Sequence, residues 1–226
     1  MTYADRADAG HALAAALHGY AGRDDVVVLG LPRGGVPVAA VVAEVLGARL
    51  DAFVVRKVGH PDQPELALGA VASAGVIVVN ERVVRAAGLS PADVDRLVAA
   101  AQIELAAQEQ AYRGDRPPLD LARQVAILVD DGVATGASMR AAAVAARRLR
   151  PARLVAAFPV APAGAAVDLA RFVDEVVCPL TPADFHSVGS YYLDFHPTPE
   201  SSLPAMLAAA RRVPPGSGSG WPNLEG

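Results

Sequence analysis

Short apolar runs that alternate with helix-like segments are the feature that most constrains the fold of this chain. The run Val26–Leu29 is followed by a helical pattern over 36–46, and the run Val125–Val129 by another over 136–149. Further apolar runs at 154–160 and 172–177 bracket a helical segment near 164–170. This order predicts an α/β fold with a mostly parallel sheet flanked by helices. In such sheets, ligands bind beyond the carboxyl ends of the strands.

The flanking segments predict one domain with a small appended part. We expect a core at about 25–179, a small hood formed by 1–24 and 180–213, and a flexible Gly/Ser/Pro-rich tail at 214–226. Two strand-like runs over 68–80 indicate a hairpin. A helix is expected to start at Ser90, where the residues form a capping-box pattern, and to run to about Tyr112. The role of the helical insertion 82–121 stays open at this level.

Composition narrows the classes of protein that the chain can belong to. Hydrophobic residues make up 53% and charged residues 19%, enough to build a large core. The net charge of −4 argues against binding nucleic acid through a broad basic face. No apolar run approaches the ~18 residues of a membrane span, and the N-terminus has no apolar signal core, so we expect a cytoplasmic protein. The single cysteine, Cys178, excludes a disulfide framework.

The first chemically suggestive strand end is Gly30-Leu31-Pro32-Arg33-Gly34-Gly35. Two glycines let the backbone approach a ligand, and a helix start just after them favours an anion. Arg33 adds a fixed positive fork. The segment matches neither a Walker loop nor a dinucleotide fingerprint. We expect Arg33, Gly34 and Gly35 to bind pyrophosphate; the alternative is a plain strand-to-helix turn.

The second strand end is the most specific signal in the chain. Asp130 and Asp131 close an apolar run and could accept hydrogen bonds from a vicinal diol or help to position a metal. The residues after them open a helix, whose free N–H groups suit a phosphate monoester. Acids at one side and a phosphate site at the other match ribose 5-phosphate, which has a diol at one end and a phosphate at the other. We therefore expect a phosphoribosyl group to be bound by this segment, comprising Asp130, Asp131, Val133, Ala134, Thr135, Gly136, Ala137 and Ser138. The alternative is a structural Asp-Asp turn with a Ser/Thr cap.

The third expected strand end is Arg56-Lys57, after a predicted strand at 53–55. Lys57 is the only lysine among 20 basic residues, which suggests a position that needs a compact charge rather than an arginine fork. We expect both cations to meet a second anionic group and the polar loop 59–65 to close over it. The alternative is an ordinary basic surface turn.

Together these three segments resemble the type I phosphoribosyltransferase family. DDGVATGAS at 130–138 is similar to its phosphoribosyl-pyrophosphate motif, LPRGG at 31–35 to its pyrophosphate loop, and the segment from Arg56 to its mobile catalytic loop. The resemblance covers roughly 26–177. Two features depart from the family pattern: Gly132 stands where a larger aliphatic residue is common, and the segment 68–121 is unusually long and helical.

An aromatic stretch follows the last predicted strand. It resembles the base-binding end of hypoxanthine-guanine phosphoribosyltransferases, although with inserted residues and no preceding lysine. The resemblance implies that Phe185 stacks on a base, that Val188 binds it through the backbone, that Tyr191 adds to this acceptor site, and that Asp194 helps to hold magnesium. The alternative is aromatic packing in a lid or a dimer contact.

The family resemblance implies an enzyme. The expected reaction transfers a 5-phosphoribosyl group from 5-phosphoribosyl 1-diphosphate to a nitrogenous base, with Mg²⁺ as cofactor and pyrophosphate as product. Arg56, Lys57 and Asp131 are the expected catalytic residues. The resemblance also implies a homodimer and a place in nucleotide metabolism. Two alternatives are a regulator that senses the diphosphate without catalysis and a hydrolase that uses water as acceptor. The acceptor base stays open.

Overall fold

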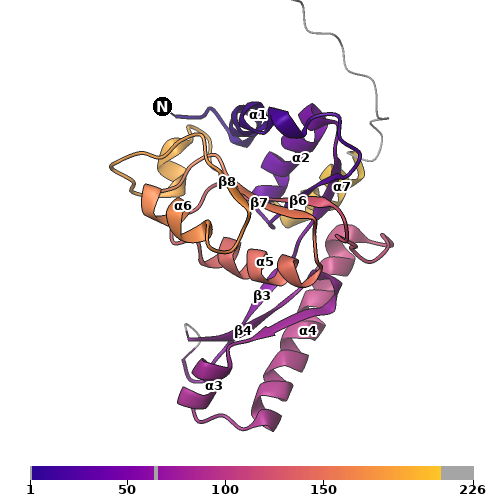
Figure 1. Cartoon of the computed structure of the whole chain (residues 1–226), viewed down its shortest axis with the longest axis vertical. Helices are drawn as coiled ribbons and strands as arrows, with labels where there is room; N and C mark the ends of the chain where they lie inside the picture. The colour runs from indigo at the N-terminus through magenta and orange to yellow at the C-terminus, as the bar shows by residue number, and fades with distance from the viewer. Residues whose placement is uncertain (1, 64–65, 210–226) are drawn as a thin grey trace, which may run out of the picture.

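Five parallel strands form the central sheet of the computed structural model, which describes residues 2–63 and 66–209 (Figure 1). The strand order is β2-β1-β6-β7-β8, and every pair of neighbours is parallel. The strands are β1 (Val26–Gly30), β2 (Arg49–Ala52), β6 (Val125–Val129), β7 (Arg153–Ala157) and β8 (Glu175–Val177). The predicted α/β fold with a mostly parallel sheet flanked by helices is therefore confirmed.

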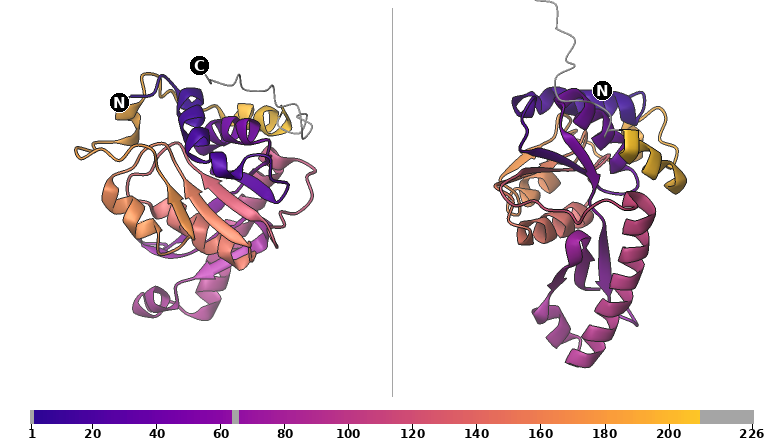
Figure 2. Two further views of the ribbon diagram at one scale, coloured as in Figure 1. Left: turned by 45° about the horizontal axis from the view of Figure 1, so that its top comes forward. Right: turned by 90° about the vertical axis from the view of Figure 1, so that its right-hand side faces the viewer.

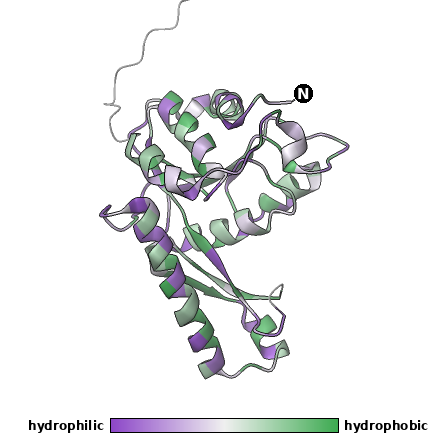
Figure 3. Cartoon of the chain, turned by 180° about the vertical axis from the view of Figure 1, so that it is seen from behind, coloured by the Kyte–Doolittle hydropathy of each residue, from purple (hydrophilic) through white to green (hydrophobic). Residues whose placement is uncertain are grey.

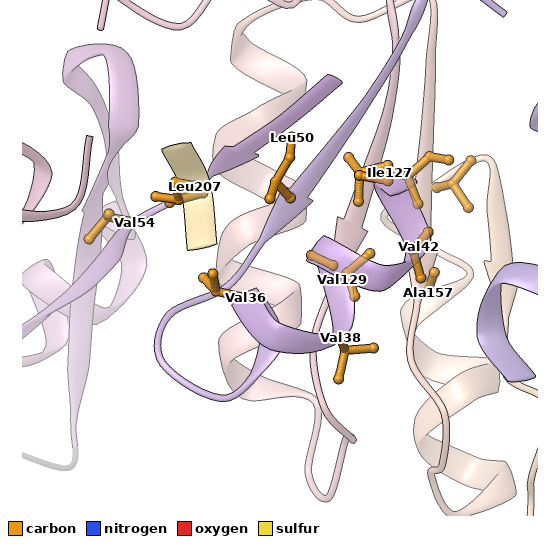
Figure 4. Packing of buried hydrophobic residues seen from close by; sticks show 14 of the residues in the cluster. Val36, Val38, Val42, Leu50, Val54, Ile127, Val129, Ala157 and Leu207 are labelled. Atoms are coloured by element: carbon orange, nitrogen blue, oxygen red, sulfur yellow. The ribbon is translucent and has the colours of Figure 1, made fainter. Parts of the chain in front are cut away.

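Helices cover both faces of this sheet. Successive strand residues point to opposite faces, so the buried strands place apolar side chains on both of them. Val26, Val28 and Ile127 belong to one core cluster, whereas their neighbours Val27 and Ala126 belong to the other. Figure 4 shows the first cluster, where valines of α2 pack near Ile127 and Val129. That face carries α1 (Arg6–Ala16), α2 (Gly35–Leu46) and α7 (Leu203–Ala209), and the opposite face carries α5 (Ala137–Arg148) and α6 (Ala163–Leu169).

A second, antiparallel sheet forms a lobe that projects from the main body (Figures 1 and 2). Its strand order is β3-β4-β5, and the last two strands form the predicted hairpin. The lobe consists of β3 (Val55–Gly59), β4 (Ala67–Ala72), β5 (Val76–Val79), α3 (Glu81–Ala86) and α4 (Pro91–Arg113). Helix α4 begins as predicted, because Ser90 and Asp93 form a complete capping box.

The predicted strand at 53–55 is wrong, and so is the expected position of Arg56 and Lys57 at its end. The second strand of the parallel sheet is β2, which ends at Ala52, and both cations lie inside β3 of the other sheet. Phe53 still donates its N–H to Gly30, but the Val54 N–H donates to Ser73 Oγ of the lobe. Since Phe53 and Val54 are buried where the two sheets meet, their apolar run does not mark a strand of its own.

Helices near both ends of the described chain lie against the main body. Helix α1 packs on α2, and α7 packs on both α2 and α4. Near the N-terminus, the Tyr3 N–H donates to the Tyr191 carbonyl, and the Leu193 N–H donates to the Tyr3 carbonyl. The domain boundaries and the hood stay predictions; residues 210–213 of the hood and the expected tail 214–226 lie outside the described residues.

Short 3₁₀ turns complete the structure at 18–20, 73–75, 188–191 and 200–202. Within residues 2–63 and 66–209, no helix is both long enough and apolar enough to cross a bilayer. The long helix α4 instead carries both polar and apolar residues along its length (Figure 3).

Candidate functional site

The candidate site lies where the strand order of the parallel sheet reverses. Strands β1 and β6 are neighbours, and Gly30 at the end of β1 pairs in register with Val129 at the end of β6. The chain leaves β1 into α2 on one face of the sheet and leaves β6 into α5 on the other. Such a switch point opens a crevice beyond the carboxyl ends of the strands.

The glycine turn after β1 packs directly against the acidic pair after β6. A Cβ atom on Gly34 would lie 2.1 Å from Asp131 Oδ2, and one on Gly35 would lie 2.4 Å from the Val129 carbonyl oxygen. Leu31 donates its N–H to that same carbonyl at 2.8 Å. Only glycine leaves room for this contact, so the two predicted segments form one continuous surface. The peptide bond between Pro32 and Arg33 is cis.

Asp130 is an acid whose charge the fold disfavours. Its Oδ1 accepts a hydrogen bond from the Asp131 N–H at 2.9 Å. Burial, reinforced by the charge of Asp131, raises the pKa of Asp130 to about 8. The fold therefore favours the neutral form of Asp130, and a ligand that donates hydrogen bonds to the carboxylate would favour its ionised form.

Asp131 is held by Arg6, a residue that the sequence reasoning missed. Arg6 Nε and Nη2 lie 2.9 and 2.8 Å from Asp131 Oδ2. Arg6 Nη1 donates to the His196 carbonyl oxygen at 2.8 Å, and the guanidinium carbon lies 4.2 Å from the centre of the Phe195 ring. Burial raises the pKa of Asp131, and the Arg6 charge opposes that shift.

The phosphate-loop prediction concerns the segment between β6 and α5. Val133 is buried, and its N–H donates to the Val160 carbonyl at 2.9 Å, which anchors the loop beside the neighbouring strand. Gly136 has a φ of +75°, a conformation that favours glycine, and it precedes the first residue of α5. Ala134, Thr135, Ala137 and Ser138 are exposed. The loop thus presents an accessible helix start, as an anion site requires.

A cavity of about 540 Å³ brings the predicted cations together with the start of α5. Arg33 comes from the glycine turn, Arg56 and Lys57 come from β3, and Ser138 comes from α5. The cations therefore share one cavity even though the last two were expected at a strand end. The walls also include Gln108 and Tyr112 of α4 and Glu200 of the C-terminal segment, which the sequence reasoning missed. The remaining lining residues are Leu31, Pro32, Phe53, Val54 and Val55.

The predicted acceptor residues lie outside that cavity, in the stretch after β8. Phe185 and Tyr191 stack on each other with ring centres 5.7 Å apart, so one face of Phe185 is already covered. Val188 packs on Gly132, where an added Cβ would lie 2.4 Å from Val188 Cγ1. This contact brings the aromatic stretch beside the acidic pair and gives a physical reason for a glycine at 132.

Asp194 lies in the same stretch, with 63% of its side chain exposed and hydrogen-bonded to His196. Hydrogen bonds from the backbone and the side chain of His196 lower the pKa of Asp194, and the charge of Arg6 adds a smaller effect in the same direction. The described part of the chain contains no cluster of three or more His, Cys, Asp or Glu residues that could hold a metal ion.

Comparison with known proteins agrees with this geometry. The model of the phosphoribosyl transferase domain matches residues 3–196. The chain belongs to this family. The resemblance to type I phosphoribosyltransferases is therefore confirmed, and the family model covers the glycine turn, both cations of β3, the acidic pair and the phosphate loop.

Two kinds of relative match most of the chain at more than 40% sequence identity. The crystal structure of the protein TT1426 from Thermus thermophilus has 42% sequence identity and a TM-score of 0.82, covering 92% of this chain and 99% of that one. Proteins from two strains of Mycobacterium tuberculosis, provisionally named as phosphoribosyl transferases, are 45% identical over 208 residues. These matches cover 92% of this chain but 47% of the mycobacterial proteins, so the chain spans about half of their length.

Proposed function

We propose that the protein transfers the 5-phosphoribosyl group of 5-phosphoribosyl 1-diphosphate to a nitrogen atom of a nucleobase and releases pyrophosphate. The observation that carries this proposal is the packing of the glycine turn against the acidic pair, beside a cavity that joins three cations to the phosphate loop. A ligand with anionic groups at both ends of a sugar diol matches that arrangement. The proposal extends to a homodimer that acts in nucleotide metabolism, on the family resemblance alone, and to a cytoplasmic location.

The chain's own residues would first bind and orient the donor. The exposed helix start at 134–138 is suited to the 5-phosphate, far from the bond that breaks. Asp130 and Asp131 would accept hydrogen bonds from the ribose hydroxyls. Binding at these remote groups would place C1 for attack, because interactions with non-reacting parts of a substrate contribute to orientation at the reacting centre.

Bond cleavage at C1 leaves the electron pair on the departing pyrophosphate and positive charge on the sugar. Arg33, Arg56 and Lys57 would stabilise the developing anion, since all three line the cavity. The negative charge of Asp131 would favour the cationic sugar. The acceptor nitrogen then bonds to C1 and loses its proton, for which Asp131 is the proposed base.

The site is compatible with a magnesium ion that would be bound mainly by the phosphates of the substrate. Mg²⁺ prefers oxygen ligands, keeps several waters and commonly uses only one or two carboxylates. Asp194 offers an exposed carboxylate of this kind near Arg6, and we propose it as a ligand. When bound, the ion would supply neutralisation of charge on the diphosphate.

The acceptor would bind along the aromatic stretch. Phe185 would offer the ring face that Tyr191 does not cover, and Val188 would offer its backbone groups. Both residues are tied to the reacting region, since Val188 contacts Gly132 next to the acidic pair. The proposed acceptor class is a flat base.

The test is pyrophosphate release from 5-phosphoribosyl 1-diphosphate with Mg²⁺ and a panel of bases, with the nucleotide product detected by mass. We expect base-dependent release from the wild-type protein and loss of at least about a hundredfold in a variant with Asp130→Asn and Asp131→Asn, because the diol partners change charge. The exposed Asp24→Asn is the matched control. Tight donor binding without turnover would overturn transfer in favour of a sensor, and base-independent release would overturn it in favour of a hydrolase.

A further inference from the structure

Helix α4, which belongs to the long insertion of this chain, carries a stripe of polar residues, two of which line the cation-lined cavity. Glu104, Gln108 and Tyr112 are spaced four residues apart, so they lie on the same face of the helix. Gln108 and Tyr112 line the cavity together with Arg33 and Arg56. An element whose role the sequence left open therefore forms one wall of the candidate site.

The stripe holds Arg56 directly. Arg56 Nη1 donates to Gln108 Oε1 at 3.1 Å, and Arg56 Nη2 pairs with the carboxylate of Glu104. The two contacts come from successive turns of one helix, so they fix the position and the plane of the guanidinium group. Without these two contacts, the Arg56 side chain would have to be ordered when a ligand binds, and the loss of its rotamer freedom would weaken binding.

The far end of the stripe is tied to the C-terminal segment. The Tyr112 hydroxyl donates to Glu200 Oε1. Burial and the Glu200 carboxylate raise the pKa of Tyr112 to about 12, so its hydroxyl stays a donor over the physiological range. Arg116 contacts the Leu50 and Leu207 carbonyls just beyond the helix.

Helix α4 is also anchored on the parallel sheet. Its last residue, Arg113, makes two hydrogen bonds of 2.9 and 3.0 Å with the carboxylate of Asp51 in β2. The side chains of Arg113 and Asp51 are only 8% and 14% exposed. The stripe therefore has a fixed position relative to the strand ends that form the site.

We propose that the α4 stripe is part of the diphosphate subsite, with Glu104 and Gln108 acting as positioning residues that hold Arg56 ready for the diphosphate. This inference rests on the proposed function, because it assigns a diphosphate to the cavity. A planar guanidinium recognises phosphate oxygens through paired hydrogen bonds, and that geometry depends on its orientation. The stripe therefore affects the affinity for ligands that carry a diphosphate and leaves the affinity for the 5-phosphate end unchanged.

The test compares Gln108→Ala with Gln110→Ala, the same change on an exposed position of the same helix. Calorimetry measures binding of inorganic pyrophosphate, 5-phosphoribosyl 1-diphosphate and ribose 5-phosphate to each purified protein. We expect Gln108→Ala to weaken the two diphosphate ligands about tenfold, the range of one hydrogen bond to a charged group. Ribose 5-phosphate affinity should stay within about twofold, and Gln110→Ala should match the wild type. Circular dichroism checks that the variants are folded.

A double-mutant cycle separates positioning from general damage to the fold. In an Arg56→Ala background, Gln108→Ala should cause no further loss of pyrophosphate affinity, because the group that it positions is gone. Equal loss for all three ligands, additive losses in the cycle, or no loss at all would overturn the inference. A wild-type protein that binds pyrophosphate but transfers nothing would overturn the proposed function and leave the stripe inference intact.

Discussion

At the scale of single residues, the site depends on charges that the fold holds in unfavourable surroundings. Asp130 is half-buried beside a second acid, and Asp131 is paired with Arg6. An acid with a strongly raised pKa in a crevice is typical of functional positions rather than of positions selected for stability. We therefore expect the acidic pair to cost the free protein stability.

The pH dependence of unfolding tests this cost. Asp130 has a folded pKa of about 8 against an unfolded value of about 4, so the folded state binds the extra proton between these pH values. The group therefore makes folding less favourable by on the order of 1 kcal/mol for each pH unit as pH rises through that window. Asp130→Asn should remove this slope and unfold at higher denaturant concentration than the wild type at pH 8.

Urea unfolding at pH 5 and pH 8 measures the difference. Asn keeps an oxygen that can accept the Asp131 N–H, so the variant should fold normally. A variant that is less stable than the wild type at pH 8 would show that the ionised carboxylate stabilises the free protein.

At the scale of secondary-structure elements, the lobe of 55–113 changes the character of the site. Strand β3 contributes Arg56 and Lys57, and α4 contributes a wall, so the lobe forms part of the cavity. The lobe is joined to the main body through a buried ion cluster in which Arg113 and Arg116 both approach Asp51. A substitution of Asp51 would remove the one carboxylate that these two largely buried cations share.

Asp51→Ala should therefore lower the free energy of unfolding by about 3 kcal/mol, the cost of removing one partner of a buried ion pair. Asp25→Ala, which removes an exposed partner of Arg23, is the control and should leave the unfolding midpoint nearly unchanged. Denaturant titrations followed by far-UV circular dichroism measure both. Equal effects of the two changes would contradict a buried anchoring role.

At the scale of the whole molecule, segments far apart in the chain meet around the acidic pair. Arg6 comes from the first helix, Asp131 from the middle of the chain, and His196 from the stretch after the last strand. Figure 2 shows the N-terminal helix beside the late segments of the main body. The site is complete only when both ends of the domain pack on the sheet.

Gly132→Ala tests this packing. Its new methyl group would overlap Val188 Cγ1, so the variant should lose about 2 kcal/mol of unfolding free energy through overpacking. Adding Val188→Ala should restore part of the loss, because the smaller side chain makes room. Thermal and urea unfolding of the single and double variants give the coupling energy. A coupling energy near zero would show that the two residues do not contact each other in solution.

Local patterns in the sequence were sufficient for the main elements and for the placement of the glycine turn and the acidic pair at two strand ends. Glycines, paired acids and a helix start lie within a few residues of one another, and the adjacent apolar runs predict parallel strands. The close approach of Gly34 to Asp131 follows, because neighbouring parallel strands end at the same edge. The capping box at Ser90 and the hairpin at 68–80 were also predicted from short-range signals.

Only the tertiary structure revealed the second sheet, the Arg6–Asp131 pair and the α4 stripe. Arg6 and Asp131 are 125 residues apart, and Arg56 and Gln108 are 52 apart. Local sequence periodicity does not predict such contacts, because they depend on how helices and strands pack against one another rather than on the conformation of each element. For the same reason, the run 53–55 suggested a strand by composition, whereas Phe53 and Val54 proved to be the buried junction of two sheets and Val55 the first residue of β3.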